Sequence, residues 1–68
     1  MTRFIEYTDK QGCRQLVNLC RIDCVVDLNK TLRIIKDKES FVLPIAYETF
    51  KAWVRNDKNP ILSAGDVL

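Results

Sequence analysis

The sequence predicts an α+β fold, in which an antiparallel meander of about five strands, curled or partly closed, carries one C-terminal helix packed on one face. Two observations support this fold class. Five short apolar runs, each closed by a turn, come first, and an amphipathic stretch with helical spacing follows them. The connections between the runs are short enough for successive strands to pair antiparallel.

The five predicted strands are rich in β-branched and aromatic residues and are bounded by turn residues. Gly12 and Asn29 stand in two of the turns, where a positive φ is accessible to them. The first two strands are expected to form a hairpin. Residues 20–23 lack alternation and are expected to form a bend or one helical turn. The strands are expected at residues 2–8, 13–19, 24–28, 31–36 and 41–43.

Residues 46–56 form the predicted helix. Pro44 ends the fifth strand, because proline has no amide proton for the sheet ladder. Glu48 in the first turn and Arg55 in the last turn carry the charges that the helix dipole favours. The helix has one apolar stripe, which we expect to cover the sheet: Ala46, Phe50, Trp53 and Val54, with Tyr47 at its edge.

The strand sequences also predict which face of the sheet is buried, because side chains alternate between the two faces of a strand. Apolar residues of one parity recur in the last three strands. We expect these residues to lie under the helix: Cys24, Val26 and Leu28, Leu32 with Ile34, and Phe41 with Leu43.

Apolar residues also occupy the opposite parity, where a solvated sheet should carry polar side chains. We expect Phe4, Val25, Ile35 and Val42 to form an interface with a second copy of the chain. A chain of 68 residues buries only about 60% of its unfolded surface and is marginally stable alone, which favours a dimer or higher oligomer. Closure of the sheet into a small barrel could also cover these residues, and single exposed apolar residues are common.

Residues 1–56 are expected to form a single small domain, followed by a C-terminal tail over residues 57–68. Pro60 and the polar cluster before it end the helix. The apolar residues of the tail could dock on the sheet, add to an edge strand or reach a partner. Disorder, or docking on its own fold, is the usual behaviour of such a segment.

The sequence predicts neither an enzyme nor a cofactor or metal site. The chain has no histidine, which is the commonest acid or base at neutral pH. A zinc site would therefore need Cys13 together with a carboxylate or a second chain. The three cysteines, Cys13, Cys20 and Cys24, are expected to be buried or half-buried thiols in a reducing compartment, or to form a disulfide between subunits on handling.

Composition bounds the partners and the compartment. No apolar stretch approaches the roughly 20 residues that span a membrane, and the N-terminus lacks the long apolar segment of a signal peptide, so a cytoplasmic protein is expected. The net charge of +2 is far from the basic excess of a dedicated nucleic-acid binder. We therefore expect a non-enzymatic protein-interaction module that acts as a homo-oligomer and has an unidentified protein partner.

A small nucleic-acid-binding regulator is the alternative function. Arg14, Arg33 and Lys36 could line one side of the sheet, with aromatic side chains nearby as stacking surfaces. Glu6 and Asp23 are interspersed with these cations and weaken the field that would attract a nucleic acid.

Four pieces of the sequence precede the predicted helix in a recognisable order: Phe4-Ile5 with Gly12, Leu16-Val17-Asn18 with Ile22, Thr31-Leu32-Arg33-Ile34, and Phe41-Val42-Leu43. This order of strands and helix resembles that of the small flagellar-associated FlbD family and related uncharacterised bacterial proteins. The likeness covers residues 3–55, although Ala46 stands where such proteins tend to carry a helix-capping serine. The family offers no catalytic residues to carry over. A weaker likeness is to small RNA-binding regulators of carbon storage, whose glycine and arginine signatures are not evident here.

Overall fold

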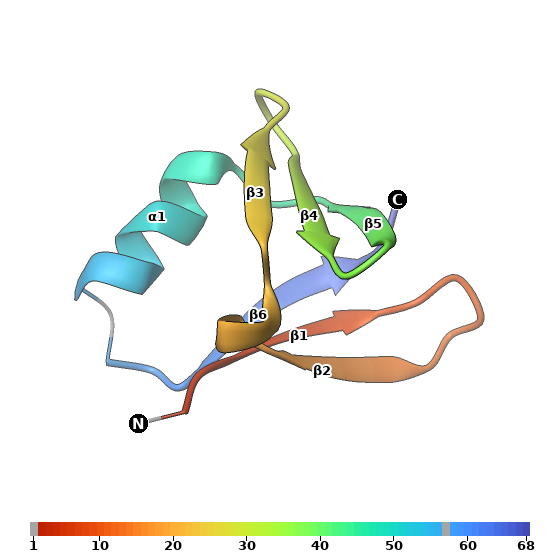
Figure 1. The fold of residues 1–68 in the computed structure, drawn as a ribbon, viewed down its shortest axis with the longest axis horizontal. Helices are drawn as coiled ribbons and strands as arrows, with labels where there is room; N and C mark the ends of the chain where they lie inside the picture. The colour runs from red at the N-terminus through yellow and green to blue at the C-terminus, as the bar shows by residue number, and fades with distance from the viewer. Residues whose placement is uncertain (1, 57) are drawn as a thin grey trace.

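The computed structural model describes residues 2–56 and 58–68 and shows a small α+β fold of two three-stranded sheets and one α-helix (Figure 1). The predicted class is confirmed, but the single five-stranded meander is wrong, because these residues form six strands in two sheets. The elements in chain order are β1 (Phe4–Thr8), β2 (Arg14–Asn18), the 3-10 helix η1 (Leu19–Arg21), β3 (Cys24–Asp27), β4 (Leu32–Lys36), β5 (Glu39–Leu43), α1 (Tyr47–Asn56) and β6 (Ile61–Asp66).

The first sheet has the strand order β2-β1-β6. The predicted hairpin of β1 and β2 is antiparallel, and Gly12 takes a φ of 85° in its turn. β6 lies parallel to β1 on the other side, with Ile5 opposite Leu62. The expected tail therefore contributes a strand to the fold, and its Ala64 is buried in the core.

The second sheet has the order β3-β4-β5 and is antiparallel throughout. The chain leaves the first sheet at η1, where the Asn18 Oδ1 accepts a hydrogen bond of 2.9 Å from the Cys20 amide. Leu19 and Ile22 pack against the core on either side of this turn. The turn breaks the meander, because it redirects the chain before β3 can pair with β2.

The C-terminal residues connect the two sheets. The Val67 amide donates to the Thr8 carbonyl in the first sheet at 2.8 Å, and the Leu68 amide donates to the Val42 carbonyl in the second at 2.9 Å. These two hydrogen bonds partly close the sheets on one side. Figure 1 shows α1 on the other side, so that the core is enclosed between the two sheets and the helix.

The core lies between the inner faces of the sheets and one face of α1. The predicted burial of β4 and β5 is confirmed, because Leu32, Ile34 and Leu43 are fully buried. The prediction for β3 is wrong by one residue, since Val25 pairs with Ile34 and faces the core. The remaining buried side chains come from the first sheet and from α1: Ile5, Val17, Ala64, Phe50 and Trp53.

The opposite parity of β3 faces outward. Cys24 and Leu28, which we expected under the helix, are exposed, and Val26 is half-buried. The reason is the non-alternating turn that precedes β3: Ile22 already points to the core, and the next residue of β3 to do so is Val25. A shift of one residue exchanges the two faces of a strand.

The predicted helix is confirmed from Tyr47 to Asn56. Phe50 and Trp53 of its apolar stripe are buried, with ring centroids 6.0 Å apart. Val54 of the same stripe is 40% exposed, because it lies at the border of the helix with β3.

Asp9 organises the turn of the first hairpin. Its carboxylate accepts hydrogen bonds of 2.9 Å from the amides of Gln11 and Cys13 and from the side chain of Gln15. The hydrogen bond from Gln15 has the largest effect, and together these bonds lower the pKa of Asp9 below its ordinary value. The hairpin turn is therefore fixed by an ionised carboxylate.

We expect the stability of the chain to depend on the protonation of Asp9. Because its pKa is lowered on folding, the ionised group stabilises the fold above the unfolded-state pKa of about 4, and this contribution is lost as the pH falls through the lower folded pKa. Urea unfolding at a series of acidic pH values should show a shallower pH dependence for Asp9→Asn. Asp66→Asn is the control, and an unchanged slope for Asp9→Asn would contradict the role of this carboxylate.

Candidate functional site

The four residues predicted as an interface lie on three different surfaces. Phe4 points outward from the first sheet, because its neighbour Ile5 faces the core. Ile35 and Val42 point outward from the second sheet, on the side opposite the buried Ile34 and Leu43. Val25 faces inward and packs against the core. The structure thus brings together two of the four, Ile35 and Val42.

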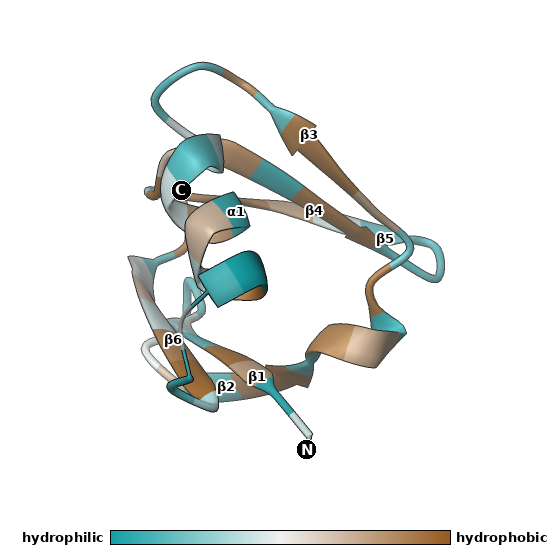
Figure 2. Cartoon of the chain, turned by 90° about the vertical axis from the view of Figure 1, so that its left-hand side faces the viewer, coloured by the Kyte–Doolittle hydropathy of each residue, from teal (hydrophilic) through white to brown (hydrophobic). Residues whose placement is uncertain are grey.

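The outer face of β3, β4 and β5, which we call the outer face of the second sheet, presents two cross-strand rows. In one row Val26, Arg33 and Val42 are paired across the three strands. In the next row Ile35 lies between Cys24 and Ser40. The three aliphatic side chains on this face are half-buried by their neighbours, and Figure 2 shows hydrophobic residues along β3 and β4.

Val26 lies on this face although, like Cys24, it was predicted to be on the buried side. The pair Val25-Val26 could have indicated its position, since two adjacent apolar residues in a strand place one on each face in either register. An apolar outer face of β3 follows from that pair without knowledge of the register.

The three cations of the nucleic-acid alternative do not form one surface. Arg14 is exposed on β2 in the first sheet, and Arg33 is exposed on the outer face of the second sheet. Lys36 lies at the end of β4, where its ammonium nitrogen is 3.8 Å from the Glu39 carboxylate. Arg14 is therefore on a different sheet from Arg33 and Lys36.

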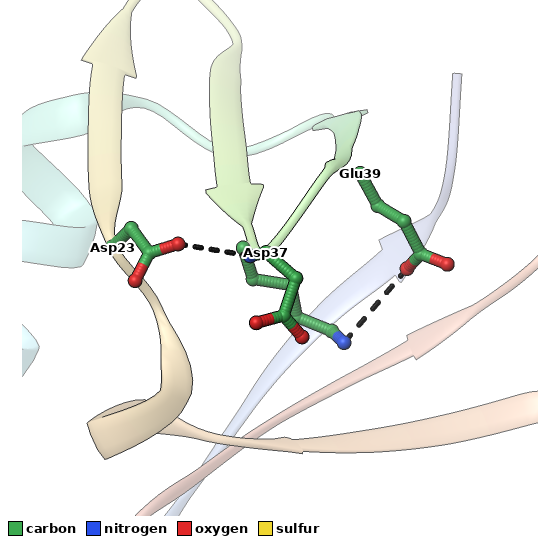
Figure 3. A network of polar contacts seen from close by, with 4 residues as sticks. Asp23, Asp37 and Glu39 are labelled. Atoms are coloured by element: carbon green, nitrogen blue, oxygen red, sulfur yellow. Dashed lines mark hydrogen bonds and ion pairs between the residues drawn. The ribbon is translucent and has the colours of Figure 1, made fainter.

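The turn between β4 and β5 holds a small polar network (Figure 3). The Asp23 carboxylate accepts a hydrogen bond of 2.8 Å from the amide of Asp37, which has a positive φ of 52°. The ion pair of Lys36 with Glu39 closes the same turn. These contacts tie the start of β3 to the β4–β5 turn, which is a structural role.

The three cysteines are exposed, contrary to the expectation that they would be buried or half-buried. Cys13 follows the hairpin turn, Cys20 lies in η1, and Cys24 is on the outer face of β3, so none of these positions faces the core. All three are free thiols. Within residues 2–56 and 58–68, no group of three His, Cys, Asp or Glu side chains is placed to hold a metal ion.

A hollow lies at the seam between the two sheets, beside the stacked rings of Tyr7 and Phe41, whose centroids are 4.6 Å apart. Burial, and then the negative charges of Glu39 and Asp9, raise the pKa of Tyr7 above its ordinary value of about 10. Tyr7 is therefore a protonated phenol at neutral pH and is not suited to act as a base.

An apolar groove runs between α1 and β3, and we call it the α1–β3 groove. Val25 lines it from the strand, and Phe50 and Val54 line it from the helix. Sequence reasoning did not find this groove, because it depends on how the helix packs beside β3. The remaining lining residues are Tyr47, Lys51 and Arg55.

Comparison of the chain with protein-family models, curated proteins and solved structures finds no match. The resemblance to the FlbD family therefore stays a prediction. Among the described residues, no helix is long and apolar enough to cross a membrane.

Proposed function

We propose that this protein is a non-enzymatic interaction module that self-associates through the outer face of its second sheet. The observation that supports the proposal is the set of aliphatic side chains, Val26, Ile35 and Val42, on the face of the sheet that points away from the core. Arg33 lies at the centre of this outer face, and arginine is a residue type that is enriched in protein interfaces.

The energetics favour covering this face. Full burial of a valine or isoleucine stabilises a structure by about 1.5–3 kcal/mol relative to full exposure. Because the three side chains are already half-buried, their full burial against a second copy would stabilise the oligomer by roughly half of that free energy for each side chain. A small domain has a net stability of only about 0.05–0.15 kcal/mol per residue, so the gain is a large fraction of the total.

We expect the chain to sediment as a dimer or larger oligomer at micromolar concentration, and Ile35→Lys to sediment as a monomer. The lysine would place a charge in the interface without entering the core, so the circular dichroism spectrum should be unchanged. Leu16→Lys is the matched control, because Leu16 is 53% exposed on the first sheet. It should leave the oligomer intact.

Two outcomes would contradict the proposal. The first is a wild-type chain that stays monomeric across the micromolar range in sedimentation or light scattering. The second is an equal loss of the oligomer in Leu16→Lys and in Ile35→Lys, because this result would assign association to general hydrophobicity and not to the outer face of the second sheet.

A further inference from the structure

The α1–β3 groove has apolar walls and a cationic rim. Val25 of β3 faces Val54 and Phe50 of the helix across it. Lys51 and Arg55 stand four residues apart on α1, so they project from successive turns on one side of the groove. Both charged residues that line the groove are therefore positive.

Within residues 2–56 and 58–68, no ion pair joins either cation to a carboxylate. The ion pair found among residues 2–56 and 58–68 joins Lys36 to Glu39, in the β4–β5 turn. Glu48 precedes Lys51 by one turn of the helix and lines a neighbouring hollow with Lys51 and Arg55, but it does not line the α1–β3 groove. The rim thus presents positive charge to whatever occupies the apolar floor.

β3 borders the groove with a free edge, because it is the terminal strand of the order β3-β4-β5. The Leu28 amide donates to the Thr31 carbonyl where the β3–β4 hairpin closes. Backbone groups alternate in direction along an antiparallel strand, so those of Val26 point to β4 and those of Val25 and Asp27 point to the free edge. Such an edge is a template for an additional strand.

We propose that the α1–β3 groove binds an extended acidic segment of a partner protein, which adds as a strand to β3. Its backbone pairs with the free edge at Val25. An apolar side chain of the segment enters the groove between Val25 and Val54, and carboxylates two residues before and after it, on the same face of the strand, pair with Lys51 and Arg55. Main-chain hydrogen bonds provide affinity in this mode of binding, and side-chain contacts provide specificity.

The charges favour an acidic segment over a second copy of this chain. A second copy of this chain has a net charge of +2, and its terminal strand β2 begins with the exposed Arg14, which has the same charge as Lys51 and Arg55. The inference goes beyond the proposed self-association and uses a different surface, so each can fail without the other.

The test is a binding titration of the full chain with a short fluorescein-labelled peptide of the pattern Glu-Thr-Val-Thr-Glu, in which valine and glutamate share one face of an extended strand, followed by fluorescence anisotropy. Saturable binding is expected. Reversing both charges, in Lys51→Glu with Arg55→Glu, should weaken the affinity roughly tenfold, because two ion pairs are replaced by repulsion. Lys10→Glu with Lys38→Glu changes the net charge equally, in turns away from the groove, and should retain the wild-type affinity.

Two further probes test the strand geometry and the sign of the charge. The same peptide with an N-methyl group on every amide cannot donate a hydrogen bond to a strand edge and should not bind. A peptide in which lysine replaces glutamate should also fail to bind. Circular dichroism of each variant verifies that the fold is kept.

The proposal is overturned if the wild type does not bind the valine-glutamate peptide, if both double variants lose affinity equally, or if the N-methylated peptide binds as well as its parent. A charge reversal that changes the oligomeric state without any peptide binding would assign the groove to a second copy. Peptide titration of Ile35→Lys separates the two surfaces, because this variant should lose self-association and keep the wild-type affinity.

Discussion

A chain that ends at Lys58 is expected to be unfolded, because residues 61–66 form a strand of the first sheet. Without β6, the central strand β1 loses one of its two partners, and the core loses Ala64, which is 2% exposed, together with Leu62. The Trp53 indole also loses the Asn59 carbonyl that accepts its hydrogen bond at 2.8 Å. The summed loss exceeds the roughly 3–10 kcal/mol that a domain of this size has in reserve.

Two-dimensional amide NMR and thermal unfolding followed by circular dichroism would check this expectation. The truncated chain should show poorly dispersed resonances and no cooperative melt. Removal of Leu68 alone is the control, since it deletes one hydrogen bond, to Val42, and an exposed side chain. That shorter truncation should stay folded. A cooperative melt of the chain that ends at Lys58 would contradict the role of β6.

There is a physical reason why the sequence did not predict β6. Its residues Ser63, Ala64 and Gly65 have low β-propensity, and they follow a proline. The strand is parallel to β1, and such a pairing requires a crossover connection, here all of the chain from β2 to α1. Its stability therefore comes from contacts with the other end of the chain, which a local pattern does not record.

The other elements were predictable because their signals are local. The turn at Gly12, the left-handed Asn29 and the apolar stripe with Phe50 and Trp53 each depend on neighbouring residues. The face of β3 was not predictable in the same way. Both Val25 and Val26 are apolar, so the pattern is compatible with either register, and the η1 turn decides which of them faces the core.

The candidate surfaces were predictable in part. An excess of apolar residues outside the core could be deduced from the alternation in β4 and β5, and Ile35 and Val42 do lie on one outer face. The α1–β3 groove could not be deduced, because its walls, Val25 and Val54, come from elements whose packing is set by the whole core. For the same reason, the sequence could not show that Arg14 lies on a different sheet from Arg33 and Lys36, the other two cations of the nucleic-acid alternative.

Arg3→Ala is expected to destabilise the chain by about 2–3 kcal/mol, since hydrogen bonds to charged groups and cation–π contacts each contribute about 1–3 kcal/mol when partly buried. The Arg3 guanidinium donates to the carbonyls of Trp53 at 2.6 Å, Val54 at 3.0 Å and Asn59 at 3.4 Å. Its Cζ lies 4.0 Å from the centre of the Trp53 ring. Arg3 thus joins the N-terminus to the last turn of α1 and to the start of β6.

The position of this guanidinium explains the size of the effect. The last carbonyls of a helix have no partner within the helix and carry the negative end of its dipole, so a cation there is favoured on both counts. Arg3→Lys should restore part of the loss, because a lysine keeps the charge but not the planar set of donors. The midpoint of thermal unfolding should fall by roughly 10–20 °C in Arg3→Ala.

Fluorescence of Trp53, the single tryptophan of the chain, offers a direct readout, because its ring contacts Arg3 and is 3% exposed. Urea unfolding followed by this fluorescence should show the largest loss of stability in Arg3→Ala and a smaller loss in Arg3→Lys, both relative to the wild type. Arg14→Ala is the matched control, since Arg14 is exposed on β2 and should unfold like the wild type. If Arg3→Ala unfolds at the same urea concentration as Arg14→Ala, the Arg3 contacts do not hold the helix to the first sheet.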